Sequence, residues 1–268
     1  MSAVEVVEGA SPVILAMPHT GIDIPRSLMR RLNLRGHTMA DTDWHIDRLY
    51  AGLLPEATTV RATFHRYVID ANRDPEGASL YPGRNTTGLV PVTDFDGEPI
   101  WTEGEVPGPA ETEERLRLFH EPYHRALKGQ IDRVKEMHGV AILYDCHSIR
   151  SNIPFLFEGT LPDFNIGTNE GKTCARIVEE AVVEICGKAH AYTSVLNGRF
   201  KGGWTTRHYG RPDEDVHAIQ MELAQSTYLE TEDTPFHYSA EKAHRLRPHL
   251  TEILHRLERL ALDGKLGN

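Results

Sequence analysis

An apolar run that ends in an acid and a histidine constrains this chain most. Residues 141–148 read Ala-Ile-Leu-Tyr-Asp-Cys-His-Ser and follow Gly139 and a long helical pattern. A run of this kind predicts a buried strand of an α/β sheet. Ligands and catalytic groups in such sheets lie just beyond the carboxyl ends of the strands, and His147 falls at that point. A strand end that carries a histidine without any function is the alternative.

Two further apolar runs end in the same way. Residues 13–18 lead to His19, and residues 217–221 lead to Glu222. The alternation of strand and helix patterns predicts a single α/β domain over residues 1–268, with a mixed, mostly parallel sheet flanked by helices. We expect helices at 25–34, 41–54, 111–138, 171–186 and 238–262, and further strands at 58–63, 67–71 and 191–196.

The stretch from about 74 to 110 departs from this alternation. It is rich in Gly, Pro, Asn, Asp and Thr and has few long apolar runs. We therefore expect a long loop insertion, a feature that is unusual in a compact domain and often functional. Residues 81–109 could form a lid over a substrate, and a surface excursion with a small hairpin is the alternative.

Composition narrows the class of function. The 268 residues carry 29 Lys and Arg against 39 Asp and Glu, a formal net charge of −10, and no basic cluster, so a nucleic-acid partner is not expected. We find no bilayer-spanning apolar run and no secretory signal at residues 1–11. The three cysteines are unpatterned, which favours a cytoplasmic protein without a disulfide framework or a cysteine zinc site.

The polar strand ends supply candidate metal ligands. Catalytic zinc takes about three protein ligands and keeps one open position, and neutral imidazoles and a carboxylate suit it. His19, Asp43 and His147 are the candidates. Asp43 stands near the start of an expected helix, where a plain N-cap is the alternative. Asp41 and Asp47 compete with it as ligands, and spacing alone does not choose among the three.

Two charged residues could complete a hydrolytic site. Metal-assisted hydrolysis needs a carboxylate that is not a ligand and that moves a proton, and Glu222 is the candidate. Arg73 follows a β segment and could stabilise an oxyanion or bind a substrate carboxylate. A salt bridge or cap is the alternative for Glu222, and a surface pair with an aspartate is the alternative for Arg73.

Two other patterns are open to a functional and a structural interpretation. His120 and His124 lie four apart on an expected helix, hence on one face, but the segment lacks the H-E-x-x-H order, which favours structural roles. Residues 201–211 combine two adjacent glycines with basic side chains that suit a small acidic ligand or simply a solvated loop, namely Lys201, Arg207 and Arg211.

Taken together, these residues resemble the N-formylglutamate amidohydrolase family. Each matching segment is short, but their joint order is fairly specific and covers residues 18 to about 229. The segments are 18–21, 41–44, 47–50, 72–75, 81–83, 88–91, 122–124, 145–148, 201–203 and 220–223.

That family is similar to zinc carboxypeptidases and to the zinc amidases that cut muramoyl–alanine bonds, which implies a carboxypeptidase-like architecture. Residues 145–148 resemble the carboxypeptidase segment that supplies the last zinc histidine, and Glu222 resembles the general base. Carboxypeptidases have His-x-x-Glu at the first motif, whereas Ile22 occupies the last position here. The muramoyl amidases take the middle carboxylate from the start of the next helix, and this pattern falls on Asp43.

The resemblance implies a zinc-dependent hydrolysis of N-formyl-L-glutamate to formate and L-glutamate in histidine breakdown, with another divalent metal as an alternative to zinc. Arg73 would hold the oxyanion, and Asn72, Arg84, Gly203 and Arg207 would bind the small anionic substrate. A deacylase of another N-acyl amino acid or small peptide is one rival. A ligand-binding protein with a degenerate site is the other. The oligomeric state stays open.

Overall fold

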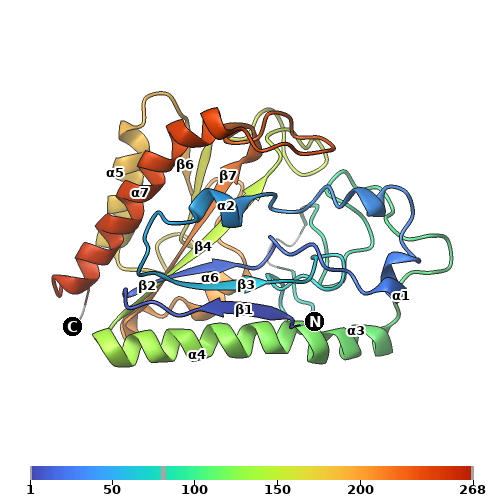
Figure 1. Ribbon diagram of the computed structural model, residues 1–268, viewed down its shortest axis with the longest axis horizontal. Coiled ribbons are helices and arrows are strands. Elements are labelled where there is room, and N and C mark those ends of the chain that lie inside the picture. The colour runs from blue at the N-terminus through green and yellow to red at the C-terminus, as the bar shows by residue number, and fades with distance from the viewer. Residues whose placement is uncertain (1, 80–82, 267–268) are drawn as a thin grey trace.

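A computed structural model describes residues 2–79 and 83–266. The described strands form one seven-stranded sheet in the order β1-β3-β2-β4-β7-β5-β6, with helices on both faces (Figure 1). The strands are β1 Val4–Val7, β2 Val13–Met17, β3 Thr58–Ala62, β4 Ala141–Ile149, β5 Phe164–Gly167, β6 Ser194–Leu196 and β7 Val216–Ala224.

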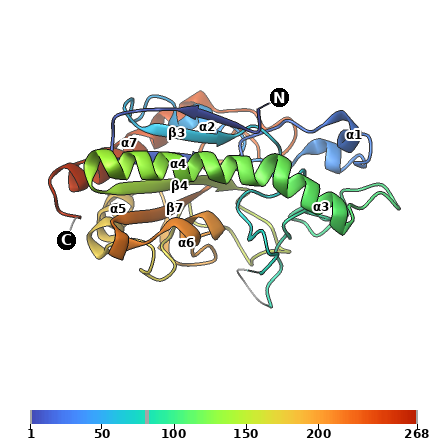
Figure 2. The ribbon, with the colours of Figure 1, turned by 90° about the horizontal axis from the view of Figure 1, so that it is seen from below.

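The longest helices pack on opposite faces of this sheet. Figure 2 shows α4 running along the strands on the near face, while α5 and α7 lie beyond the sheet. The α-helices are α1 Arg26–Met29, α2 Ile46–Tyr50, α3 Pro109–Arg115, α4 Glu121–His138, α5 Arg176–Lys188, α6 Trp204–Tyr209 and α7 Ala240–Leu262. A π-helical turn, η2 (Leu116–His120), joins α3 to α4.

Strand pairing confirms the predicted fold class. β2 pairs in parallel with β3 and β4, β4 with β7, and β5 with β6, whereas β1–β3 and β5–β7 are antiparallel. The sheet is therefore mixed and mostly parallel. The sequence patterns did not predict β1 and β5, because each has only four residues and neither forms a long apolar run.

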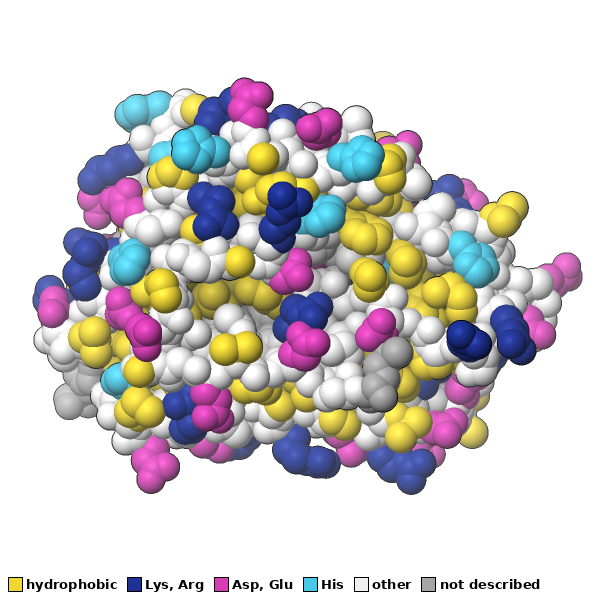
Figure 3. All heavy atoms as spheres, in the orientation of Figure 1, with side chains coloured by type: hydrophobic (Ala, Val, Ile, Leu, Met, Phe, Trp, Pro, Cys, Tyr) yellow, Lys and Arg dark blue, Asp and Glu magenta, His cyan; other side chains and the backbone are white. Residues whose placement is uncertain are grey.

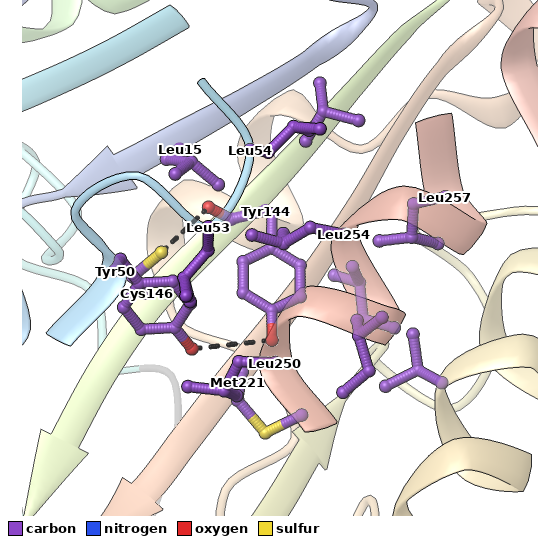
Figure 4. Packing of buried hydrophobic residues seen from close by; sticks show 14 of the residues in the cluster. Leu15, Tyr50, Leu53, Leu54, Tyr144, Cys146, Met221, Leu250, Leu254 and Leu257 are labelled. Atoms are coloured by element: carbon purple, nitrogen blue, oxygen red, sulfur yellow. Dashed lines mark hydrogen bonds between the residues drawn. The ribbon is translucent and has the colours of Figure 1, made fainter. Parts of the chain in front are cut away.

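Side chains that alternate along β4 divide the interior into two cores. Tyr144 and Cys146 enter the core that α2 and α7 cover, where Tyr144 packs beside Tyr50 (Figure 4). Leu143 enters the opposite core, beneath Leu127 of α4 and its neighbours. The alternation follows from the two-residue period of a strand. Residues 145 and 147 thus continue the face that α4 covers.

Several predicted elements are shorter than expected. The expected helix at 41–54 is reduced to α2, because His45 adopts a left-handed backbone (φ 60°) directly before it. The helix expected at 25–34 is only α1, and residues 67–71 form turns instead of a strand. The long helix expected at 111–138 is present over 109–138, but it includes the π-helical turn.

No helix among residues 2–79 and 83–266 is long and apolar enough to cross a membrane. On the face shown in Figure 3, the side chains of Lys and Arg are scattered among those of Asp and Glu and do not gather in one basic area.

Candidate active site

Polar side chains replace apolar ones toward the carboxyl ends of the central strands. The register pairs Asp145 of β4 with Gln220 of β7, and His147 with Glu222. All four side chains are buried, with Glu222 the most exposed at 8%. His19 follows the end of the neighbouring strand, β2, by two residues. Three adjacent parallel strands therefore deliver acids and imidazoles to one edge of the sheet.

Three of these buried side chains form a group that could hold a metal ion. One ligand atom from each of His19, Asp43 and His147 lies within 4.8 Å of the other two. Nδ1 of His19 is 3.7 Å from Asp43 Oδ2, and Nδ1 of His147 is 3.1 Å from the same oxygen. Two imidazole nitrogens and one carboxylate are a typical ligand set for a catalytic metal with an open position.

The outer nitrogens of both imidazoles face other polar groups. His19 Nε2 is 2.7 Å from Asp70 Oδ1, and His147 Nε2 is 3.0 Å from Asp145 Oδ1. Asp70 can only accept, so with a metal bound it would favour the His19 tautomer that carries the proton on Nε2 and leaves Nδ1 as a ligand atom. Arg66 donates to the second oxygen of Asp70 at 2.6 Å, which fixes that carboxylate in turn. The donor set thus fits a divalent metal.

Electrostatics keep these carboxylates ionised. Burial alone would raise the pKa of Asp43, but hydrogen bonds with His147 and His19 outweigh it and lower the pKa below the usual range. Burial would also raise the pKa of Asp70, whereas Arg66 and Arg73 lower it well below that range. An ionised Asp43 is the form that coordinates a cation.

Glu222 has the opposite environment. Burial raises its pKa to about 8, and the positive neighbours do not cancel this effect. Gln220 Nε2 donates to Glu222 Oε2 at 3.0 Å, and Gln220 Oε1 accepts from the Gly203 amide at 2.6 Å. A carboxyl whose pKa lies close to neutral can both accept and return a proton, which is what a general acid–base group requires.

One cleft unites the three ligand candidates with Glu222. Arg66, Arg73 and Arg199 line it as well, so the cleft carries positive charge around the candidate metal group. Arg73 donates through Nε to Thr87 O at 2.9 Å and through Nη2 to Thr87 Oγ1 at 3.0 Å. Such a cleft suits a small ligand with carboxylate groups.

Comparison with known proteins identifies the family. A family model described as N-formylglutamate amidohydrolase matches residues 11–229. Two N-formylglutamate deformylases, from Pseudomonas putida and Pseudomonas aeruginosa, are each 44% identical over 93% of this chain and 93% of their own. The chain belongs to the N-formylglutamate amidohydrolase family. A crystal structure of N-formylglutamate amidohydrolase from Ralstonia eutropha JMP134 covers 98% of this chain and all of its own, with a TM-score of 0.81 and 25% identity.

Two of the residues predicted to bind substrate, Asn72 and Gly203, line the cleft of this chain. Asn72 accepts from the Thr205 amide at 2.8 Å through Oδ1, so its Nδ2 faces His147 Nε2 at 3.1 Å. Gly203 lies against it, and a Cβ added there would stand 2.2 Å from Asn72 Nδ2. A glycine is therefore required at position 203 for this close approach. The roles of both residues in binding stay predictions.

The other two predicted substrate residues lie outside the cleft lining. Arg84 is exposed, and Arg207 donates through Nε to Gly202 O at 2.8 Å. Sequence reasoning missed Arg66 and Arg199, which do line the cleft. Two sequence features could have indicated these arginines. Arg199 lies in the glycine-rich loop, and Arg66 lies four residues before Asp70.

The competing carboxylates stand apart from the candidate metal group. Asp41 Oδ2 accepts from Tyr67 Oη and from the Phe95 amide, each at 3.0 Å, and burial raises its pKa to about 7. Asp47 is exposed on α2. Within the described ranges, the ligand group contains neither of them. The alternative role of Asp43 as a plain N-cap is wrong, because α2 begins three residues later, after His45.

Proposed function

We propose that this chain hydrolyses N-formyl-L-glutamate to formate and L-glutamate, a step of histidine breakdown. The 44% identity to two N-formylglutamate deformylases over 93% of the chain supports this substrate. The observation that carries the chemistry is the buried His19–Asp43–His147 group with Glu222 in the same cleft. We also propose a cytoplasmic location, with which the three free cysteines are compatible.

His19, Asp43 and His147 would hold the metal, for which zinc is the proposed identity because it favours nitrogen and carboxylate ligands in sets of three. When bound, zinc supplies Lewis-acid polarisation of the formyl oxygen and a lower pKa for the attacking water. The carboxylates Asp70 and Asp145 would orient the two imidazoles from outside, as such partners commonly do.

Glu222 would move the protons. Its carboxylate takes a proton from water as the water oxygen bonds to the formyl carbon, and it returns this proton to the nitrogen as the carbon–nitrogen bond breaks. The second proton of the water follows, so the products are formate and an ammonium group. A pKa near 8 lets Glu222 carry a proton between these steps, and its ionised fraction starts the reaction.

The arginines of the cleft would bind the negative charges. Arg73 would stabilise the oxyanion, and Asn72 and Gly203 would contact the substrate. We add Arg199 as a ligand for a glutamate carboxylate, because it lines the same cleft. Arg84 and Arg207 remain weaker candidates for this role, since neither side chain is part of the lining.

A substrate panel with metal analysis tests the proposal. The purified protein should contain about one divalent ion per chain and release formate from N-formylglutamate faster than from N-formylaspartate or a formylated dipeptide, and acetylglutamate should be a poor substrate. A higher kcat/KM for another acyl amino acid would favour the deacylase rival. Metal-loaded protein without turnover of any substrate would favour the binding-protein rival.

A further inference from the structure

The segment at 67–73 carries three residues that serve the candidate site but forms no strand. Asp70 contacts His19, Asn72 faces His147, and Arg73 lines the cleft. Because the segment has no strand partner, several of its backbone carbonyls need donors from elsewhere. Where those donors come from therefore decides how firmly the three side chains are held.

One face of the helix spanning 109–138 supplies these donors. Arg115 Nη1 donates to Val68 O at 2.9 Å. His124 Nε2 lies 2.7 Å from Ala71 O, and His120 Nε2 lies 3.1 Å from Arg73 O. A carbonyl can only accept, so both imidazoles donate through Nε2–H. Three side chains thus donate to three carbonyls of the segment. The two imidazoles bind the carbonyls of the residues directly before and after Asn72.

The π-helical turn accounts for this alignment. Residues four apart share a face of an α-helix, as His120 and His124 do. Arg115 and His120 are five apart and would diverge on a regular α-helix. The turn η2 begins directly after Arg115 and ends at His120, and a π-helix brings residues five apart together. The inserted turn therefore places all three donors along one face, opposite the segment.

Burial and packing restrain the two imidazoles. His120 is 2% exposed and His124 is 8% exposed. Burial lowers the pKa of both, and for His124 the value is about 3, so each ring is neutral at pH 7 and keeps the single Nε2 proton that it donates. Trp204 of α6 packs against His124, with ring centroids 4.7 Å apart. These contacts leave each ring little freedom to rotate away from its carbonyl.

We propose that His120 and His124 are positioning residues that clamp the segment and thereby set the placement of Asn72 and Arg73 in the active site. The pair is neither a second zinc site nor mere core packing. The catalytic consequence rests on the proposed hydrolase function, whereas the clamp itself is a property of the fold. A clamp of this kind acts on turnover only through the residues that it positions.

A double-mutant cycle tests the catalytic part. H120L should lower kcat/KM for N-formylglutamate about tenfold, the usual effect of losing one well-placed hydrogen bond. H120Q keeps an amide donor near the position of Nε2 and should restore most of the activity. In an R73A background, H120L should lower kcat/KM by clearly less than tenfold, because the Arg73 side chain that the clamp positions is gone although the carbonyl of residue 73 remains. If H120L lowers kcat/KM by the same factor in the wild-type and R73A backgrounds, the proposal is overturned.

Amide hydrogen exchange tests the clamp without reference to activity. The Asn72 amide donates to Asp70 Oδ1 and the Arg73 amide to Asp70 O. H120L and H124L should speed exchange of these amides about tenfold, and H124F, which also lacks the donor, replaces H124L should that variant not fold. H208L is the matched control, because His208 is exposed, stacks on Trp204 and lies outside these contacts.

The outcomes separate the two proposals. Unchanged exchange at Asn72 and Arg73 in H120L and H124L would overturn the clamp, whatever the activity of the protein. Equal acceleration in H208L would also overturn it, since the effect would then come from general loosening of the aromatic cluster. The variants could exchange faster while the wild-type protein does not hydrolyse N-formylglutamate. That result would support the clamp and reject the proposed function.

Discussion

The two halves of one sheet face share the same burial but not the same chemistry. Leu143 and Asp145 are adjacent on the α4 side of β4, and each side chain is 0% exposed. The apolar half gains free energy from burial beneath α4. The polar half would lose free energy by desolvation unless each group found a partner. Here Thr206 donates to Asp145 at 2.9 Å, and Gln220 donates to Glu222 at 3.0 Å.

This contrast indicates a division of labour along the strands. Changes in the amino half should affect stability and leave the chemistry of the folded protein intact, because no side chain there lines the cleft. Changes in the carboxyl half should affect turnover more than folding when the shape of the side chain is kept. The predictions below test whether the two halves can be separated in this way.

The largest effect should come from Glu222→Gln. The amide nearly keeps the shape of the carboxylate but cannot take a proton, so kcat should fall about a thousandfold, within the range for loss of a general acid–base group. Metal content should not change, since Glu222 lies outside the ligand group. Formate release and metal analysis measure both quantities. Glu214→Gln, at an exposed glutamate, is the control. Retention of more than a tenth of the turnover would remove Glu222 from its assigned role.

The matching change in the apolar half is Leu143→Ala. The cavity that it leaves beneath α4 should lower the free energy of unfolding by about 3 kcal/mol, as in other buried leucine truncations. Urea denaturation measures this loss, and kcat/KM below the transition should stay close to wild type. Leu34→Ala is the control, because Leu34 is 90% exposed. A large fall in kcat/KM of folded Leu143→Ala would show that the two halves are not separable.

The third change concerns the rim of the polar half. Arg199→Gln should raise KM for N-formylglutamate about tenfold with a smaller change in kcat, if Arg199 makes the proposed charged contact to a carboxylate of the substrate. Steady-state kinetics of Arg84→Gln and Arg207→Gln provide the comparison, since neither residue lines the cleft. A larger effect at either of these positions would return the carboxylate-binding role to them.

Strand patterns allowed much of this architecture to be predicted. His19, His147 and Glu222 lie together because apolar runs end at them, and parallel strands bring such ends to one edge. Their proposed roles still await experiment. Asp43 could be separated from Asp41 and Asp47 only in three dimensions, because the choice depends on which carboxylate faces both imidazoles.

Features set by long-range contacts escaped prediction. Residues 67–71 have strand-like composition, but the donors of Arg115 and His124 satisfy carbonyls there, so a strand ladder is not needed. The π-helical turn has no local signal that distinguishes it from a regular helix. Arg199 reaches the cleft through a loop, and its contacts to Leu156 O and Asn85 O join segments that are distant in sequence.

The smallest effect concerns pH and His124, the α4 histidine that donates to the carbonyl of Ala71. Burial lowers the pKa of His124 to about 3, so the folded protein keeps it neutral while the unfolded chain takes a proton below pH 6.5. Its contribution to stability is therefore present above pH 6.5 and is lost as the pH falls toward 3. Asp41, with its pKa raised to about 7, acts in the opposite sense, because stability falls as the pH rises through that value.

The difference between wild type and His124→Gln isolates the histidine from these opposing groups. Between pH 7.5 and pH 5.5, the free energy of unfolding should fall by about 1 kcal/mol more in wild type than in the variant, since glutamine does not titrate. Urea denaturation at the two pH values measures this difference. His37→Gln, at an exposed histidine, should behave like wild type. Equal pH dependence in wild type and His124→Gln would mean that folding does not lower the pKa of His124, so the ring would not be held neutral in the folded protein.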